Sequence, residues 1–194
     1  MTHRSRPDPT RRAWLAFASA SAAAAVAALL ISTGPTWAAV PPAAYDTAFQ
    51  QFQRAAAGGD ASTIESAADQ FDKLAASEPA DPVLLAYSGA ATAMRATTTM
   101  LPWRKMGFAE DGLAQIDKAL AMLAPQHDTL LHHGVPATLE ARFVAATTFL
   151  RLPSMFNRHA RGVRLLDEVA KHPLLAGAPA GFRAAVAKRK QESQ

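Results

Sequence analysis

The sequence predicts an all-α protein made of three antiparallel helical hairpins with a capping helix at the C-terminal end. Three observations lead to this prediction. Apolar residues recur at helical spacing, alanine dominates them, and proline or glycine interrupts the pattern at the ends of each segment. With 194 residues, of which 49% are hydrophobic, the chain fits one domain with enough apolar surface for a core.

Residues 1–38 are predicted to be an export signal ahead of a helical-repeat domain over residues 39–194. Four arginines precede a nearly uncharged apolar run over residues 13–32, and the small residues of STGPTWAA follow it. A basic region, an apolar core and a small-residue site are the three parts of a bacterial signal peptide. We expect cleavage after Ala38, because a site one residue later would put a tryptophan where a small residue is needed.

The segment TRRAWLA resembles the twin-arginine translocation signature Ser/Thr-Arg-Arg-x-Phe-Leu-Lys, with Trp14 in place of the Phe and Ala16 in place of the Lys. This resemblance implies export of the folded protein. A general secretory signal with two adjacent arginines is the alternative. An uncleaved inner-membrane anchor is a third interpretation, because about 20 apolar residues span a bilayer. All three place the domain in the periplasm.

The first hairpin is predicted over residues 43–78. Its first helix has an apolar stripe at steps of four, three and four residues and ends at the GGD of residues 58–60. Ser62 followed by Glu65 predicts a capping box at the start of the second helix. The residues expected to face inward are Tyr45, Phe49, Phe52 and Ala56 in the first helix and Ile64, Ala68, Phe71 and Ala75 in the second.

The second hairpin is predicted over residues 82–124. Asp81 and Pro82 are typical cap and first-turn residues, since a proline loses nothing where the backbone N–H has no partner. Pro102 is expected to break the first helix, and the second helix is expected from about Phe108. The stripes consist of Leu84, Tyr87, Ala91 and Met94, then Leu113, Ile116, Leu120 and Leu123.

The third hairpin is predicted over residues 136–172, followed by a capping helix over 179–190. Pro136 opens its first helix, and its second helix follows Pro153 with Phe156 as the first inward residue. The inward stripe of the first helix consists of Leu139, Phe143, Ala146 and Leu150. We expect no strand between Tyr45 and Gln194.

Aspartates recur at equivalent places in three segments. QFDKLAASEP, QIDKALAMLAP and LLDEVAKHP align on Asp72, Asp117 and Asp167, at spacings of 45 and 50 residues. GLAQID and GVRLLD, which begin at Gly112 and Gly162, repeat at the same offset of 50 residues. Because the aspartates recur by position in the repeat, we expect a shared structural role such as an ion pair at the helix surface.

The segment AADQFDKLAASEPADPVLLAYSGAA resembles the junction between successive tetratricopeptide repeats, with a small residue, an aromatic, Pro and Asp-Pro, then a helix with Tyr and Gly. The resemblance is partial over residues 43–172, because the repeat is longer than the usual length of about 34 residues and the Trp and Leu-Gly pattern is missing. It implies a short α-solenoid whose concave face holds peptides or partner proteins. An unrelated helical stack is the alternative.

The most distinctive segments are LPWRKMGF (residues 101–108) and the equivalent LPSMFNRHAR (residues 152–161). Apolar area beside cationic charge is typical of binding hot spots. If both loops lie at one end of the stack, they form a patch suited to an acidic peptide, a carboxylate or a lipid head group. The alternative is a loop whose tryptophan packs over the hairpin end. The candidate partner-binding residues are Trp103, Arg104, Lys105, Met106, Phe156, Arg158 and Arg161.

Three histidines and an aspartate lie in the linker after the second hairpin: His127, Asp128, His132 and His133. Such a group can suggest a metal. However, the chain has neither a helical His-x3-His pair nor a cysteine to complete a site. We predict a solvated loop, no metal and no cofactor.

The sequence indicates a binding protein instead of an enzyme. It contains no serine elbow, phosphate loop or His-Glu-x-x-His motif, so no catalytic residue is predicted. The net charge of +4 comes mostly from residues 1–38, so we expect no nucleic-acid partner.

We therefore expect an exported binding or scaffolding protein of the bacterial envelope, accessory to a transport or assembly complex. Its expected partner is a protein or peptide, and the membrane is a partner only if the N-terminal segment is retained. The alternative is a small helical ligand-binding or metal-binding periplasmic protein that uses a pocket between the hairpins.

Overall fold

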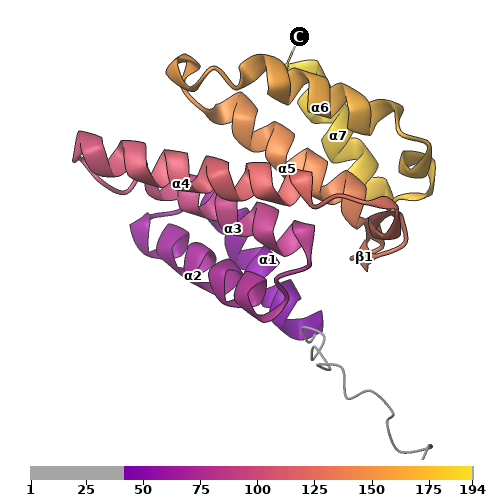
Figure 1. Cartoon of the computed structure of the whole chain (residues 1–194), viewed down its shortest axis with the longest axis horizontal. Helices are drawn as coiled ribbons and strands as arrows, with labels where there is room; N and C mark the ends of the chain where they lie inside the picture. Colours follow the sequence, from indigo (N-terminus) through magenta and orange to yellow (C-terminus); the bar gives the residue numbers. More distant parts are fainter. Residues whose placement is uncertain (1–41, 194) are drawn as a thin grey trace, which may run out of the picture. The chain divides into compact units, whose positions relative to one another are not determined.

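The computed structural model describes residues 42–193, which form an all-α domain (Figure 1). The predicted signal peptide, its arginine pair, its cleavage site and the alternative anchor lie outside the described residues. The helices of the described part are α1 (Pro42–Ala56), α2 (Ala61–Ser77), α3 (Pro82–Arg95), α4 (Pro102–Ala121), α5 (Ala137–Arg151), α6 (His159–Lys171) and α7 (Ala180–Glu192). No helix among them has the length and apolar character that a membrane crossing needs.

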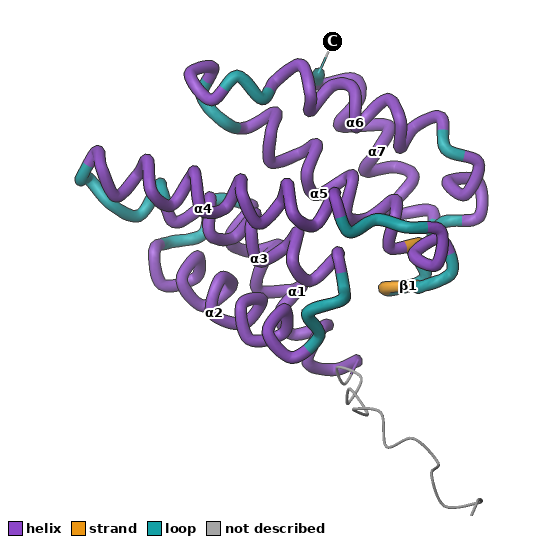
Figure 2. The backbone as a smooth tube through the Cα atoms, in the orientation of Figure 1, coloured by secondary structure: helices purple, strands orange, loops and turns teal. Residues whose placement is uncertain are grey.

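Successive helices pack against each other as three hairpins. The hairpins are α1–α2, α3–α4 and α5–α6, and α7 packs on α6 (Figures 1 and 2). Helix α3 also contacts α1 and α5, so these odd-numbered helices lie side by side. The predicted fold class is confirmed, as are the three hairpins over residues 43–78, 82–124 and 136–172 and the final helix.

One hydrophobic core runs through all three hairpins. Its largest fully buried side chains include Phe71, Leu84, Ile116, Phe149 and Leu166, which come from five different helices. Helix α3 is buried on most of its surface because α1, α2, α4 and α5 all pack against it. This central helix therefore positions the elements on both sides of it.

Close backbone contact at glycine explains part of the sequence repeat. A Cβ atom at Gly112 would lie 2.4 Å from the carbonyl oxygen of Gly89, where α4 crosses α3. A Cβ atom at Gly162 would lie 3.1 Å from the carbonyl oxygen of Ala146, where α6 crosses α5. Both repeated glycines therefore lie where the second helix of a hairpin approaches the backbone of the first.

Helix α2 is capped by Asp60, so the predicted capping box at Ser62 and Glu65 is wrong. The Asp60 Oδ1 atom accepts a hydrogen bond of 2.8 Å from the backbone N–H of Thr63. In a capping box the Ser62 hydroxyl would accept from the N–H of Glu65, but Ser62 lies inside α2 and donates to Asp60 Oδ1 at 2.9 Å. Glu65 forms an ion pair with Arg95. The predicted cap of α3 is confirmed, because Asp81 Oδ1 accepts from the N–H groups of Val83 and Leu84 at 2.8 and 3.3 Å.

Two predicted helix starts are wrong. Helix α4 begins at Pro102 instead of near Phe108, because Pro102 occupies the first helical turn, where a proline starts a helix instead of breaking it. Helix α6 begins at His159, after a short 3-10 helix (Ser154–Phe156) and Asn157 in the left-handed region. Phe156 therefore precedes α6, and Trp103 belongs to the first turn of α4.

A short β-hairpin lies in the linker between α4 and α5, so the prediction that no strand follows Tyr45 is wrong. Strand β1 (Leu131–His132) pairs antiparallel with β2 (Val135–Pro136). The two residues between them, His133 and Gly134, both have positive φ, at 51° and 78°. Positive φ at both turn positions suits a tight hairpin whose strands are too short to give a period-two pattern.

Candidate functional site

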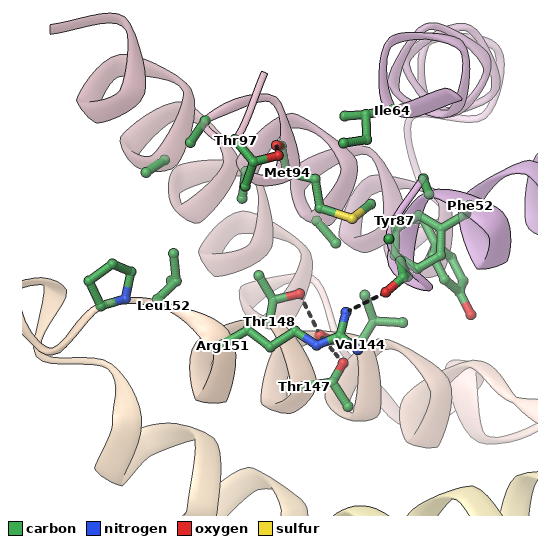
Figure 3. Close-up of a pocket in the computed structure, with 18 of the residues that line it drawn as sticks. Phe52, Ile64, Tyr87, Met94, Thr97, Val144, Thr147, Thr148, Arg151 and Leu152 are labelled. Atoms are coloured by element: carbon green, nitrogen blue, oxygen red, sulfur yellow. Dashed lines mark hydrogen bonds between the residues drawn. The ribbon is translucent and has the colours of Figure 1, made fainter. Parts of the chain in front are cut away.

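A groove of about 1040 Å³ crosses the described part of the chain (Figure 3). It is lined by residues of α1, α3, α5 and α7, with further residues from α2, α4 and the 3-10 helix before α6. All three hairpins and the final helix therefore contribute to one surface. The groove exists only when the hairpins are stacked.

The floor of the groove is apolar. Phe52, Met94 and Val144 project into it from three different helices (Figure 3). Between them lie alanines of α3, including Ala90 and Ala93. The small alanine side chains fill little space, so the helix surface there is hollowed.

The polar groups on the floor are mostly satisfied within the protein. The hydroxyls of Thr147 and Thr148 both donate to the carbonyl oxygen of Val144, at 3.0 and 2.9 Å (Figure 3). These bonds back to the preceding turn occupy the hydroxyl protons of both threonines. The floor therefore offers few hydrogen-bond donors to an occupant.

The walls of the groove are basic. Lys105, Arg151, Lys188 and Arg189 line it, and Glu192 is the acidic residue among the lining residues. Arg189 forms an ion pair of 2.8 Å with Glu192, while Lys188 lies 4.0 Å from the same carboxylate.

Arg151 is the cation on the α5 wall. Its Nη1 atom donates a hydrogen bond of 3.4 Å to the carbonyl oxygen of Ala56 at the end of α1 (Figure 3). Desolvation lowers the pKa of Arg151, the nearby charge of Arg189 lowers it further, and Glu192 acts in the opposite direction. Among residues 42–193, no carboxylate forms an ion pair with Arg151. An anion placed in the groove would relieve this repulsion.

The structure brings three of the seven predicted partner-binding residues into the groove. Lys105 and Met106 of α4 and Phe156 lie along its lining, together with the exposed Met155. The two distinctive segments, residues 101–108 and 152–161, thus both contribute to one groove. Trp103, which is 69% exposed, and Arg104 lie on the first turn of α4, outside the lining residues.

The other two predicted residues, Arg158 and Arg161, pair with Asp117 instead of lining the groove. The Arg158 Nη2 atom lies 2.9 Å from Asp117 Oδ2, and Arg161 pairs with the other oxygen. Both guanidinium groups also lie over the ring of Phe149, with centroid distances of 5.5 and 5.2 Å. These arginines therefore brace α6 and the segment before it against α4 and α5.

The predicted structural role of the repeated aspartates is confirmed. Besides the Asp117 pairs, Asp72 of α2 lies 3.5 Å from the guanidinium of Arg95 in α3, and Asp167 of α6 lies 3.0 Å from the ammonium of Lys190 in α7. Each aspartate pairs with a cation from a later segment of the chain. The repeated aspartates thus mark contacts between helices that are stacked in the fold.

A buried carboxylate lies between α1, α3 and the linker and was missed by the sequence analysis. Glu140 of α5 is only 4% exposed, and its Oε1 atom accepts hydrogen bonds from the hydroxyls of Tyr45 and Tyr87, at 2.9 and 2.8 Å. Burial raises the pKa of Glu140, and the tyrosine hydrogen bonds and His132 only partly oppose it. Glu140 lies three residues before Phe143, a member of the predicted inward stripe, and this helical spacing was the sequence signal for its burial.

The histidine linker packs onto the first half of the domain, so the prediction of a solvated loop is wrong for two of its three histidines. His127 is buried and accepts a hydrogen bond of 2.9 Å from the N–H of Ala124. His132 Nε2 lies 2.8 Å from Asp81 Oδ2, and the more exposed His133 pairs with Asp46.

The linker also lines one side of a second, open pocket of about 430 Å³, which includes His132 and Asp81 among its lining residues. Within residues 42–193, no three His, Asp or Glu side chains are arranged to hold a metal ion.

Comparisons with known proteins found no family model, no curated protein and no solved structure that matches this chain.

Proposed function

We propose that this chain is an exported, non-enzymatic binding protein of the bacterial envelope, and that the groove holds an apolar segment of a protein partner. The observation that carries the proposal is the groove itself, an apolar floor of about 1040 Å³ to which every hairpin contributes. Pockets for small molecules commonly measure about 300–1000 Å³. A groove at the upper end of this range that crosses the whole stack favours a longer occupant.

Exposed apolar side chains at one end of the groove support the same proposal. Met155 lies on the groove and is 69% exposed, and Met100 and Trp103 are exposed at the neighbouring start of α4. The turn between α3 and α4 and the turn between α5 and α6 lie at the same end of the domain (Figure 1). Large apolar side chains gathered on a surface mark an interaction site.

The envelope location rests on the signal-peptide pattern of residues 1–38. The binding role agrees with the resemblance to tetratricopeptide repeats, whose stacked hairpins present a concave binding surface. Both supports come from the sequence, and the groove adds the place where a partner would lie.

A steric block tests the proposal. Ala185 of α7 lines the groove and is exposed, whereas its neighbour Ala184 is exposed and outside the lining. We expect Ala185→Trp to fill part of the groove without disturbing the core, and Ala184→Trp to serve as the matched control.

The readout is cross-linking of the tagged full chain in its own bacterium, followed by quantification of captured envelope proteins. The proposal expects specific partners with the unmodified chain and with Ala184→Trp, and their loss with Ala185→Trp. Equal capture by all three chains would contradict a role for the groove. Saturable binding of a small molecule that only Ala185→Trp abolishes would instead favour the ligand-binding alternative.

A further inference from the structure

We infer that the occupant of the groove is an acidic amphipathic α-helix of the partner. This inference rests on the proposed function and adds to it the conformation and the charge of the bound segment. It is carried by two independent features of the groove, the shortage of free polar groups on its floor and the basic charge of its walls.

The shortage of polar groups favours a helix over an extended peptide. An extended backbone has N–H and C=O groups that need partners when they are buried. The threonine hydroxyls of the floor already donate to the carbonyl oxygen of Val144, and the remaining floor is mostly aliphatic or aromatic. An α-helix satisfies its own backbone and presents only side chains, so it can lie on such a floor.

The hollowed floor suits the apolar face of that helix. Ala55, Ala90 and Ala93 leave room between the larger side chains of Phe52 and Met94. Apolar residues of a bound helix at positions i, i+3, i+4 and i+7 form one stripe that can fill these hollows.

The charge of the walls favours acidic residues on the flanks of that stripe. The groove has four cationic side chains and one carboxylate among its lining residues. The cations come from α4, α5 and α7, so they are spread around the groove instead of converging on one point. Several carboxylates along a helix match this spread better than the single head group of a lipid or fatty acid.

Charge also argues against the chain's own N-terminal segment as the occupant. That segment contains Arg4, Arg6, Arg11 and Arg12 against one acidic residue. It would bring further positive charge to walls that are already basic. A separate acidic partner is the better electrostatic match.

The test uses three designed helical peptides of about 18 residues, long enough for measurable helicity in water. They share one apolar face of leucine and alanine and carry Glu, Gln or Lys on the other positions. Binding to the purified protein is measured by fluorescence anisotropy. We expect the acidic peptide to bind about tenfold more tightly than the neutral one at low salt, the basic peptide to bind most weakly, and added salt to narrow the difference.

Two charge-reversed variants with the same net charge separate the groove from the general field of the protein. Lys105→Glu with Lys188→Glu reverses two exposed lysines of the groove. Lys118→Glu with Lys171→Glu reverses two exposed lysines outside it. We expect the groove pair to weaken the acidic peptide about tenfold and to strengthen the basic one, and the outer pair to leave the order of the peptides unchanged.

The outcomes distinguish the two proposals. If all three peptides bind equally and Ala185→Trp abolishes their binding, the groove binds helices but the inferred acidic preference is wrong. If the groove pair and the outer pair have equal effects, the inference is also wrong. If no peptide binds while Ala185→Trp still abolishes partner capture in the cell, the helical occupant is wrong and the proposed function stands. If no peptide binds and Ala185→Trp also leaves partner capture unchanged, both the inference and the proposed function are wrong.

Discussion

The groove and the buried cluster around Glu140 handle polar side chains in opposite ways. In the cluster, Tyr45 and Tyr87 donate to one carboxylate and His132 pairs with Asp81, all between the helices and the linker. In the groove, Arg189 and Lys188 share Glu192, whereas Lys105 and Arg151 form no ion pair within residues 42–193, and the floor is apolar. The comparison teaches that side chains already paired within the fold stabilise it, whereas those without an internal partner are available to a ligand.

Removal of the carboxylate from the cluster should have the largest effect on stability. Glu140→Ala would leave two buried tyrosine hydroxyls without their acceptor and open a cavity, so we expect unfolding free energy to fall by about 3 kcal/mol. Urea denaturation measures this change. Glu140→Gln retains an acceptor oxygen and should cost clearly less. Equal losses for both variants would show that the tyrosine hydrogen bonds contribute little.

The same cluster should make stability depend on pH. The folded state raises the pKa of Glu140 through burial. It also raises the pKa of His132: desolvation acts to lower this pKa, but the hydrogen bond and charge of Asp81, together with the charge of Glu140, outweigh desolvation. Both groups therefore bind protons more tightly when folded. The stability that Glu140 contributes is fully present below its ordinary pKa of 4.5, and that of His132 below its ordinary pKa of 6.5. Each contribution is lost as pH rises through the raised pKa of that group in the folded protein.

We therefore expect the urea midpoint to fall between about pH 5 and about pH 8. Glu140→Gln should flatten the acidic part of this profile and His132→Gln the upper part. A midpoint that rises with pH over this range in the unmodified protein would contradict the assigned direction of both pKa shifts.

The braces between hairpins should have an intermediate effect. Asp117→Ala would leave Arg158 and Arg161 without their shared carboxylate, and because all three side chains are partly exposed we expect a loss of only about 1 kcal/mol. Asp167→Ala, which removes the single pair with Lys190, should cost less. Thermal unfolding of both variants in the same buffer checks the order. A larger loss of stability in Asp167→Ala than in Asp117→Ala would contradict the greater contribution of Asp117, which two arginines share.

Groove variants should have the smallest effect on stability. Arg151→Gln and Ala185→Trp change side chains that are exposed and make few internal contacts, so we expect unfolding free energies within about 0.5 kcal/mol of the unmodified protein. Arg164→Gln, on the surface of α6 outside the groove, is the control for loss of an arginine. If the groove variants destabilise the domain as much as Glu140→Ala, the contrast between the two regions is wrong.

The helical spacing of apolar residues, with the proline, glycine and capping residues at segment ends, was sufficient to predict the helices and their pairing. Helical spacing located the stripes that contain Phe71, Ile116 and Leu166, and Asp81 marked the start of α3. The repeated Asp72, Asp117 and Asp167 indicated the ion pairs before their partners were known. The errors in the elements were local. They lie at Asp60, Pro102, Phe156 and the turn after His132, where neighbouring residues compete to start or cap an element.

Of the candidate site, the sequence located Lys105, Met106 and Phe156, because their mixture of apolar and basic residues is visible in short segments. It misplaced Arg158 and Arg161, since an exposed arginine and one paired with a distant aspartate look the same in a linear sequence. It also missed Arg151 and the alanines of the floor, which acquire a role only when α1, α3, α5 and α7 are side by side.

The sequence by itself determined the class of fold, the number of hairpins and most helix ends, because these depend on residues within a few turns of each other. Only the tertiary structure decided which polar groups are paired and which line a cavity. The reason is distance along the chain: Glu140 meets Tyr87 across 53 residues and Tyr45 across 95. Such contacts follow from how the hairpins stack, which no local pattern encodes.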